Sequence, residues 1–318
     1  MHFPKVAVVI LNWNGKKYLE KFLPSVMAST YPNLEIILGD NASTDESVIF
    51  VQEQYPALRI ISTFRNLGFA GGYNHVLTMV DADYYVLLNS DVEVTDNWIE
   101  PVIELMEGDP MIAAAQPKIL SYKDKTQFEY AGAAGGFLDR YGYAFCRGRI
   151  FDALETDKDQ YNQPSEIFWA SGAAFFIKKA IWDLSGGLDH HFFAHMEEID
   201  LCWRLKNRGY KIMYCPQGKV YHVGGGSLSV ESPYKTYLNF RNNLVMIQKN
   251  LPPGKSFRII FIRFWLDLLS LIKYLFQGNL KNALAVSKAH FYFFGNLNRN
   301  RKNISFNKTT FNAAGLYR

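Results

Sequence analysis

An acidic turn at residues 89–91 has the clearest chemistry in this sequence. The turn reads Asn89-Ser90-Asp91 and follows an apolar run, residues 84–88, that is typical of a buried parallel strand. Open α/β sheets bind ligands at the carboxyl ends of such strands. We therefore expect the Asp91 carboxylate to bind a divalent cation, which would neutralise a diphosphate. This favours an enzyme that uses a nucleotide-activated substrate.

A second acidic group consists of Glu197, Glu198 and Asp200. The apolar residues that follow have helical spacing and predict an amphipathic helix that ends near Gly209. The three carboxylates would crowd the N-terminus of this helix, where the macrodipole stabilises negative charge. Either they only stabilise the helix, or one of them is a general base that deprotonates a hydroxyl.

Two further segments contain candidate ligand-binding residues. His222 precedes a glycine run, and its neutral imidazole could complete a metal or diphosphate site, although a lone histidine is more often structural. The sequence SGAA at 171–174 places small residues before an apolar strand, where backbone can approach a ligand closely. We expect Gly172 and Ala173 to contact the acceptor substrate.

The elements that would position these residues alternate along the chain. Short apolar runs typical of buried strands recur at residues 5–11, 34–38 and 60–62. Residues 16–27 have helical spacing, and Ser43 and Glu46 have the spacing of a capping box, which predicts a helix from about Thr44. Alternating strands and helices predict an α/β fold with an open, twisted, mainly parallel sheet flanked by helices.

Composition indicates one large domain, or a domain with an appendage. The chain has 318 residues, of which 48% are hydrophobic. Its three cysteines, Cys146, Cys202 and Cys215, are scattered and include no CxxC pair. This pattern argues against a disulfide framework or a zinc site and fits a reducing compartment. The first apolar run is too short for a signal peptide, so we expect a cytoplasmic location.

Positive charge is concentrated in the last part of the chain. Residues 235–318 hold 14 Lys and Arg and a single acid, Asp267, so they carry +13, whereas the rest carries −9 of the overall +4. Such asymmetry suggests that this part faces an anionic surface or partner. Basic residues such as Arg299, Arg301 and Lys302 can also bind nucleic acid, but no nucleic-acid motif accompanies them, and we expect no such partner.

Residues 257–277 are long enough to span a bilayer, but they contain four charged residues, Arg258, Arg263, Asp267 and Lys273. Central charges are costly in hydrocarbon, so an interfacial amphipathic helix fits better than a span. Its apolar residues would lie on an anionic membrane surface: Phe261, Phe264, Trp265, Leu268, Leu271 and Leu275. The alternative is a helix that packs on the catalytic domain with a solvated basic face.

Six segments are specific in combination, although each alone is weak: VVILNWNG near the start, GDNASTD at 39–45, RNLGFAGGYN at 65–74, LLNSDVEV at 87–94, SGAAFFIKK at 171–179 and GGLDHHFFAHMEEIDLCWR at 186–204. Together they resemble glycosyltransferase family 2 with the GT-A fold, especially its bacterial rhamnosyltransferase-like members. The resemblance covers about residues 4–250. It implies an inverting glycosyltransferase that takes a sugar from a nucleoside diphosphate sugar.

The resemblance also implies roles for individual residues. The nucleotide-binding set would be Asn12, Asn14, Asp40, Asn66, Gly71, Asn74 and Asn89, with Asp40 at the base or ribose. Asp91 and His222 would bind Mg²⁺ or Mn²⁺ with the diphosphate. Glu198 falls where the family usually has its Asp base and is the expected base. Glu is one methylene longer than Asp, so Glu197 or Asp200 could act instead, although helical geometry would turn Asp200 away. Asn89 replaces the first Asp of the family's DxD motif, so metal binding rests on Asp91.

The expected organisation is a catalytic domain at residues 1–250 and a basic, amphipathic, helical C-terminal region at 251–318. Residues 1–95 would form the nucleotide half and residues 96–230 the acceptor half. Residues 121–165 have little periodicity and would be a variable insertion or acceptor loop.

The expected donor is dTDP-L-rhamnose or a UDP-hexose. The acceptor would be a glycan or lipid-linked saccharide of cell-surface polysaccharide synthesis, at the inner face of the cell membrane. Two alternatives stay open, a nucleotidyltransferase and a sugar-nucleotide-binding scaffold that has lost catalysis. A dinucleotide-dependent oxidoreductase is disfavoured because no GxGxxG follows the first strand.

Overall fold

The computed structural model describes residues 3–150, 153–224 and 232–298. The first part of the chain contains these elements: β1 (Val6–Asn12), α1 (Lys16–Met27), β2 (Leu34–Asp40), α2 (Ser47–Gln54), β3 (Arg59–Ser62), α3 (Gly68–Leu77), β4 (Tyr84–Asn89), β5 (Val92–Val94), α4 (Glu100–Glu107) and β6 (Ile112–Ser121). An irregular region with short strands follows: β7 (Gly136–Leu138), β8 (Ala144–Cys146), β9 (Arg149–Ile150), β10 (Ala153–Leu154) and β11 (Ser165–Ile167). The remaining elements are β12 (Ala174–Lys178), α5 (Lys179–Ser185), the 3₁₀ helix η1 (His190–Phe192), α6 (Glu197–Asn207), β13 (Lys211–His222), α7 (Pro233–Asn250), α8 (Pro253–Phe276) and α9 (Leu280–Gly295).

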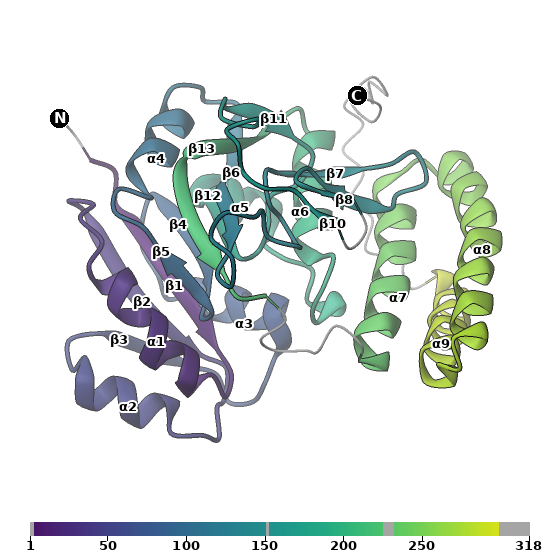
Figure 1. The fold of residues 1–318 in the computed structure, drawn as a ribbon, viewed down its shortest axis with the longest axis horizontal. Helices are drawn as coiled ribbons and strands as arrows, with labels where there is room; N and C mark the ends of the chain where they lie inside the picture. Colours follow the sequence, from purple (N-terminus) through teal and green to yellow (C-terminus); the bar gives the residue numbers. More distant parts are fainter. Residues whose placement is uncertain (1–2, 151–152, 225–231, 299–318) are drawn as a thin grey trace.

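One sheet organises the molecule (Figure 1). Its strand order is β11-β13-β6-β12-β4-β1-β2-β3, and β5 pairs with β13. The pairs β3–β2, β2–β1, β1–β4 and β6–β13 are parallel, whereas β12 lies antiparallel between β4 and β6. The predicted open, mainly parallel α/β sheet is confirmed.

The apolar runs form the strands because both faces of the sheet are covered. Every residue of β1 from Val6 to Ile10 is at most 2% exposed, as is every residue of β4 from Tyr85 to Leu88. Strands buried on both faces cannot alternate apolar and polar residues, which explains their continuous hydrophobic sequences. The polar residues that end these strands therefore emerge together at one edge of the sheet.

The predicted start of a helix near Thr44 is wrong. Helix α2 begins at Ser47 because the Ser43 hydroxyl accepts hydrogen bonds from Asn12 Nδ2 (3.1 Å) and the Asn14 amide (3.0 Å) in the neighbouring loop. That hydroxyl is used to join two loops rather than to cap a helix. The Asp45 carboxylate instead accepts from the Ser47 amide at 3.0 Å.

Residues 121–165 contain two short hairpins, β7–β8 and β9–β10, within a largely irregular segment. An ion pair of 2.7 Å between Lys118 and Asp157 anchors the segment to β6, and the Lys118 side chain is almost fully buried. The segment lies beside the C-terminal helices, as Figure 1 shows for β7 and β8.

Helices α7, α8 and α9 lie together at one end of the molecule (Figure 1). Of the apolar residues expected on the outer face of α8, Phe261, Phe264, Trp265 and Leu275 are exposed, whereas Leu268 and Leu271 are half-buried. No helix within the described ranges is both long and apolar enough to cross a bilayer.

Candidate active site

Three polar residues end adjacent parallel strands at the same edge of the sheet. Asn12 at the end of β1 is the register partner of Asp40 at the end of β2, and Leu11 is the partner of Asn89 at the end of β4. The structure therefore brings together Asn12, Asp40 and Asn89. This is the edge at which open α/β sheets bind ligands.

The loops after β1 and β2 are joined by side-chain hydrogen bonds. The Asn14 side-chain oxygen accepts from the amides of Thr44 (2.7 Å) and Asp45 (3.2 Å). The Asn12 side chain is fully buried, yet its oxygen has no hydrogen-bond partner. A buried acceptor without a partner is costly, so this oxygen is available to a ligand donor.

Of the three predicted nucleotide-binding residues on or near α3, Asn66 and Asn74 also hold the protein's own loops. Asn66 accepts from the Gly68 amide at 2.8 Å, and a side chain at Gly71 would collide with Leu67. Asn74 uses both ends of its amide on Leu188, donating to its carbonyl at 2.6 Å and accepting from its amide at 3.0 Å. Asn74 thus joins α3 to the loop before α6.

A cluster of carboxylates and an imidazole lies at the β4–β5 turn. His222 Nε2 is 3.2 Å from Asp91 Oδ1 and 3.4 Å from Asn89 Nδ2, and its Nδ1 is 3.4 Å from Glu129 Oε1. Asp91, His222 and Glu129 are all at least nine-tenths buried. The predicted metal residues Asp91 and His222 are therefore neighbours, because β5 and β13 pair at Val92 and His222.

Their charges are mutually dependent. Burial alone would raise the pKa of the Asp91 carboxyl, but the charge and hydrogen bond of His222 outweigh it and lower that pKa. Burial would lower the pKa of His222, but Glu129 and Asp91 raise it to about 10. An imidazolium between two carboxylates is therefore the stable form of this cluster by itself.

The donor set fits a divalent metal. Carboxylate oxygens suit Mg²⁺ and Mn²⁺, and an imidazole nitrogen is tolerated better by Mn²⁺. His222 Nδ1 is buried without a well-oriented hydrogen bond, so this side chain is not saturated by the protein. Asp91 and His222 Nε2 would be the groups that hold a cation, once Nε2 has lost its proton, while His222 Nδ1 faces Glu129.

A second centre is formed by Glu197 and Glu198 at the start of α6. Burial raises the pKa of Glu198 to about 7, and burial together with the neighbouring Glu198 charge raises the pKa of Glu197 well above its usual value. One oxygen of each side chain is buried without a hydrogen-bond partner. Within the described ranges no cation compensates this pair, and Glu198 changes protonation near neutral pH.

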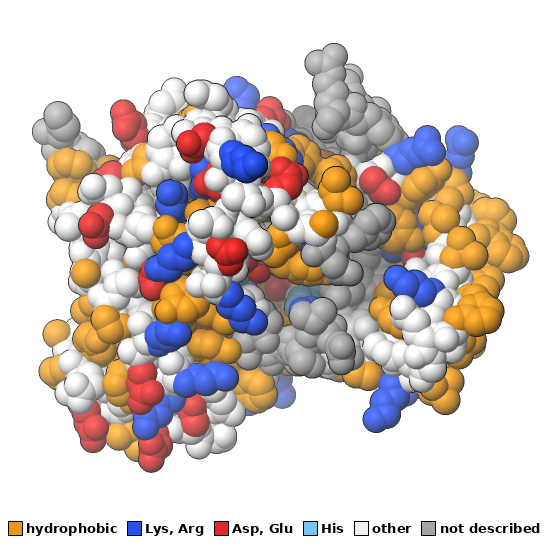
Figure 2. Space-filling model, viewed as in Figure 1, with side chains coloured by type: hydrophobic (Ala, Val, Ile, Leu, Met, Phe, Trp, Pro, Cys, Tyr) orange, Lys and Arg blue, Asp and Glu red, His pale blue; other side chains and the backbone are white. Residues whose placement is uncertain are grey.

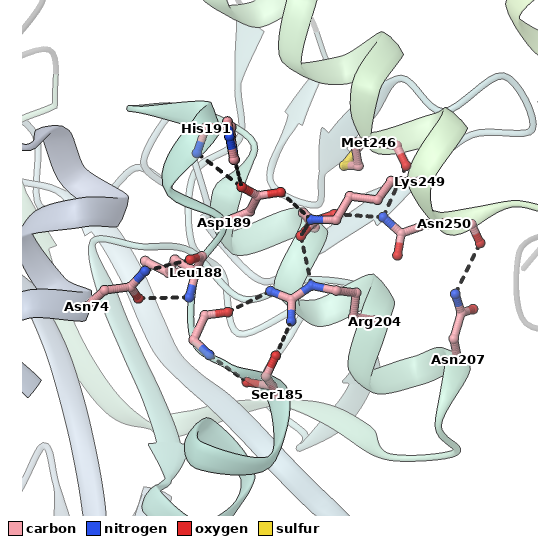
Figure 3. A network of polar contacts seen from close by, with 12 residues as sticks. Asn74, Ser185, Leu188, Asp189, His191, Arg204, Asn207, Met246, Lys249 and Asn250 are labelled. Atoms are coloured by element: carbon pink, nitrogen blue, oxygen red, sulfur yellow. Dashed lines mark hydrogen bonds and ion pairs between the residues drawn. The ribbon is translucent and has the colours of Figure 1, made fainter. Parts of the chain in front are cut away.

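The third acidic residue of this helix has a different environment. Asp200 is fully buried and accepts 2.8 Å hydrogen bonds from Arg204 Nε, Lys249 Nζ and Asn250 Nδ2. Figure 3 shows Arg204, Lys249 and Asn250 converging from α6 and α7. Burial raises the pKa of the Asp200 carboxyl, but Lys249 and Arg204 outweigh it and lower that pKa. Both oxygens are occupied, which argues against Asp200 as the base.

The loop that leads into α6 is strained and held from two sides. Phe193, His195 and Met196 have φ values of 65°, 69° and 76°, which are unfavourable for these residue types. Asn242 on α7 donates to the carbonyls of Phe192 (3.0 Å), Ala194 (2.9 Å) and His195 (2.7 Å).

On the opposite side of this loop, the Phe193 carbonyl accepts from the amides of Phe69 (2.7 Å) and Ala70 (3.3 Å) in the first turn of α3. Gly68 leaves the space for this contact, since a side chain there would collide with Phe193. The loop before Glu197 and Glu198 is therefore fixed to both α3 and α7.

The predicted acceptor residues lie next to the β4–β5 turn. The Ala173 carbonyl accepts from the Asn89 amide at 3.0 Å, and a side chain at Gly172 would meet the Phe69 ring at 3.0 Å. Gly225 and Gly226 of the predicted glycine run lie outside the described residues.

Sequence reasoning missed Glu129 and Asn242. Each comes from a segment far along the chain, and neither belongs to a pattern that signals a site. A further group of potential metal ligands, Asp189, His190 and His191, lies near α6. Its Asp189 carboxylate is already paired with Lys249 at 2.7 Å.

Comparisons with known proteins agree on the class of protein. A family model described as glycosyl transferase family 2 matches residues 7–185. An N-acetylglucosaminyl-diphospho-decaprenol L-rhamnosyltransferase of Mycobacterium tuberculosis is 26% identical, over 68% of this chain and 75% of that protein. The rhamnosyltransferase WbbL of Escherichia coli is 23% identical, over 68% of this chain and 83% of that protein.

Solved structures share the fold at low identity. GalNAc-T7 with UDP, GalNAc and Mn²⁺ has a TM-score of 0.60 at 17% identity, over 78% of this chain and 48% of that chain. The present chain thus spans about half of that protein. A mannosyltransferase of Pyrobaculum calidifontis in complex with GDP-Man and Mn²⁺ has a TM-score of 0.55 at 15% identity, over 99% of this chain and 79% of that chain.

Proposed function

Because this chain belongs to glycosyl transferase family 2 and has the GT-A fold, we propose that it transfers a sugar from a nucleoside diphosphate sugar to a saccharide acceptor with inversion. The observation that carries this proposal is the coexistence of two different carboxylate centres. Asp91 is paired with an imidazole at the sheet edge, whereas none of the cations that the structure describes pairs with Glu197 or Glu198. One centre suits a diphosphate with its metal, and the other suits a base.

The nucleotide is bound at the carboxyl ends of β1, β2 and β4. The unpartnered Asn12 oxygen accepts a hydrogen bond from the nucleotide, and Asp40 reads the base or ribose. Asp91 and His222 would hold Mn²⁺ or Mg²⁺, which would stabilise the charge that develops on the departing diphosphate. Glu129 orients His222 from its other ring nitrogen.

Glu198 is the general base. Its carboxylate takes the proton of the acceptor hydroxyl while that oxygen forms a bond to the anomeric carbon. The bond between this carbon and the diphosphate oxygen breaks at the same time, and the nucleoside diphosphate leaves with the electron pair. Attack from the opposite face inverts the configuration. Glu197 stays protonated beside Glu198, so the pair carries one negative charge when Glu198 is ionised.

The relatives suggest the substrates. The name of the mycobacterial relative describes rhamnosyl transfer to a diphospho-decaprenol-linked sugar. We propose dTDP-L-rhamnose as the donor, with a UDP-hexose as the second choice, and a lipid-linked saccharide as the acceptor. The chain would then act in cell-surface polysaccharide synthesis, as a peripheral protein on the anionic inner face of the cell membrane.

The reaction is tested by measuring nucleotide release from dTDP-, UDP- and GDP-sugars, with and without Mn²⁺ or Mg²⁺. The full chain is compared with Asp91→Ala and Glu198→Gln, and Glu166→Gln is the matched control because Glu166 is an exposed carboxylate that pairs with Lys206. We expect metal-dependent release from one donor, lost in the first two variants and kept in the control.

A lipid-linked acceptor is added if no donor reacts alone. Tight donor binding without turnover even then would support a sugar-nucleotide-binding scaffold instead. Release of diphosphate from a nucleoside triphosphate would support a nucleotidyltransferase.

A further inference from the structure

Helix α8 buries charged side chains and exposes apolar ones. Arg263 and Asp267 are 2% and 0% exposed, whereas Phe257 and Phe276 are 71% and 89% exposed. A surface helix of a water-soluble protein normally has the opposite arrangement. The orientation of α8 therefore needs a reason.

Specific contacts fix this orientation. The Arg263 guanidinium donates to Asn243 on α7 and lies 3.6 Å from the centre of the Tyr143 ring. Asp267 accepts from the Tyr143 hydroxyl (2.8 Å), and its other oxygen is 3.0 Å from His290 Nε2 on α9. A buried charge is tolerated only when it is paired in this way. Turning α8 about its axis would leave these charges without partners.

The outward faces of α8 and α9 form one apolar surface, which we name the hairpin face. Its exposed side chains are Phe257, Phe261, Phe264, Trp265, Leu269, Ile272, Leu275, Phe276, Leu280, Leu284, Phe291 and Phe294. Figure 2 shows hydrophobic side chains gathered at this end of the molecule, with Lys and Arg beside them. Exposed apolar surfaces of this extent mark interaction sites.

The charges that border the hairpin face have one sign. Arg258, Lys273, Lys281 and Lys288 are exposed, and the single acid between Pro253 and Gly295 is the buried Asp267. Aromatic side chains flanked only by cations suit the boundary between the headgroups and the acyl chains of an anionic bilayer.

We propose that the hairpin face lies in the surface of an anionic lipid bilayer, with its aromatic and aliphatic side chains below the headgroups and its cations at the phosphates. A protein held on the bilayer would meet a lipid-linked acceptor there. This link to the acceptor rests on the proposed function. The contacts of Tyr143 with Arg263 and Asp267 connect α8 to the β7–β8 turn, which lies in the proposed acceptor half.

A second copy of this chain fits the face less well. In a two-fold symmetric contact the same surface meets itself, so the cations of one copy would face those of the other with no exposed acid between them. A bilayer with anionic headgroups supplies the missing negative charge.

Co-sedimentation of the full chain with vesicles tests the proposal. Vesicles of phosphatidylglycerol with phosphatidylcholine are compared with vesicles of phosphatidylcholine alone. The variants are Phe261→Ser with Trp265→Ser, and Lys273→Gln with Lys281→Gln. Matched controls lie at the opposite end of the molecule (Figure 1): Ile49→Ser on α2, and Lys17→Gln with Lys21→Gln on α1.

We expect binding to the anionic vesicles that weakens as salt rises. The aromatic double variant should bind about tenfold or more weakly. The lysine double variant should bind about twenty-five-fold more weakly, at roughly fivefold for each cation. The controls should bind like the wild type. Thermal unfolding monitored by circular dichroism shows whether each variant is folded.

Absence of binding by the folded wild type, or equal binding by all variants, overturns the proposal. A second result would also overturn it: the wild type does not bind vesicles, but it forms a dimer in sedimentation equilibrium that the aromatic double variant does not form. The hairpin face would then bind a second copy of the chain. Donor turnover is measured on the same preparations and does not depend on vesicle binding. Loss of turnover therefore tests the transferase proposal, and loss of vesicle binding tests the membrane proposal.

Discussion

At the scale of single residues, the sequence located the acidic group at the start of α6 and favoured Glu198 as the base, but it left Glu197 and Asp200 as alternatives. Glu197, Glu198 and Asp200 have similar chemistry and fall within one helical turn. The structure separates them by their partners. Asp200 is bound by Arg204, which has i, i+4 spacing on the same helix, and by Lys249 and Asn250 of α7, which no local pattern connects to it.

Glu198→Gln should abolish turnover and stabilise the fold at alkaline pH. Loss of a general base costs about 10²–10⁴-fold in rate. In the wild type the rate should rise with pH through about 7, because the carboxylate is the active form and burial raises its pKa to about 7. A pH–rate profile and thermal unfolding at two pH values measure these effects.

The stability effect has the sign expected for a raised acid pKa. The folded state holds the proton more tightly than the unfolded chain, so stability falls as pH rises from the unfolded value toward about 7. A neutral amide avoids this loss, which is of the order of 1–3 kcal/mol. A profile that falls with pH over this range would contradict the assignment of Glu198 as the base.

Asp200→Asn should fail in a different way. Removing this carboxylate leaves Lys249 and Arg204 without their shared partner, and breaking a buried ion pair costs about 3–5 kcal/mol. Urea unfolding should show the loss at neutral pH. In the wild type this contribution should disappear as pH falls through the lowered pKa of Asp200. Unchanged stability with lost activity would instead give Asp200 a direct role in the reaction.

At the scale of secondary-structure elements, sequence periodicity predicted the β1, α1 and β4 segments well because each is a long, strongly patterned run. It failed where a side chain bonds outside its own element. Ser43 has the spacing of a helix cap but joins two loops, so α2 starts later than predicted. The charges of Arg263 and Asp267 suggested a helix face in solvent or headgroups. They are buried instead, because Tyr143 and His290 pair with Asp267 and Asn243 pairs with Arg263.

The strained loop before α6 depends on α7 through Asn242. Asn242→Ala removes three donated hydrogen bonds and leaves three carbonyls without them. We expect a fall in kcat of about tenfold or more with little change in the donor KM, because base geometry is lost while the nucleotide site is kept. The pH–rate profile should shift toward lower pH, since a released loop lets water reach Glu198 and lowers its pKa.

Gln248→Ala is the matched control on the same helix, since the Gln248 amide donates to Leu297 away from this loop. It should leave both kcat and the pH–rate profile unchanged. An Asn242→Ala enzyme that loses stability but keeps the wild-type pH–rate profile would reduce Asn242 to a structural residue.

At the scale of the whole molecule, the six sequence segments lie mainly on or beside the sheet edge, which is why the fold class and most candidate residues could be predicted. The missing parts come from tertiary contacts. Glu129 reaches His222 from the irregular region 121–165, and α7 packs on α6 while α8 and α9 pack on α7. Residue patterns report local structure and burial, but they do not report which distant segment covers a site.

The division predicted at residue 250 has a consequence for truncation. Removing residues 252–318 deletes Arg263 and Asp267, the partners of Asn243 and Tyr143, and uncovers the face of α7 that contacts α8 and α9. We expect the shortened chain to be destabilised and to lose donor turnover even with a water-soluble acceptor. The Phe261→Ser, Trp265→Ser double variant keeps the buried network and should retain both the fold and this turnover. Thermal unfolding followed by circular dichroism and nucleotide release are measured on both proteins. If the shortened chain unfolds at the same temperature and turns over donor at the same rate as the full chain, α8 and α9 are only an attached membrane anchor.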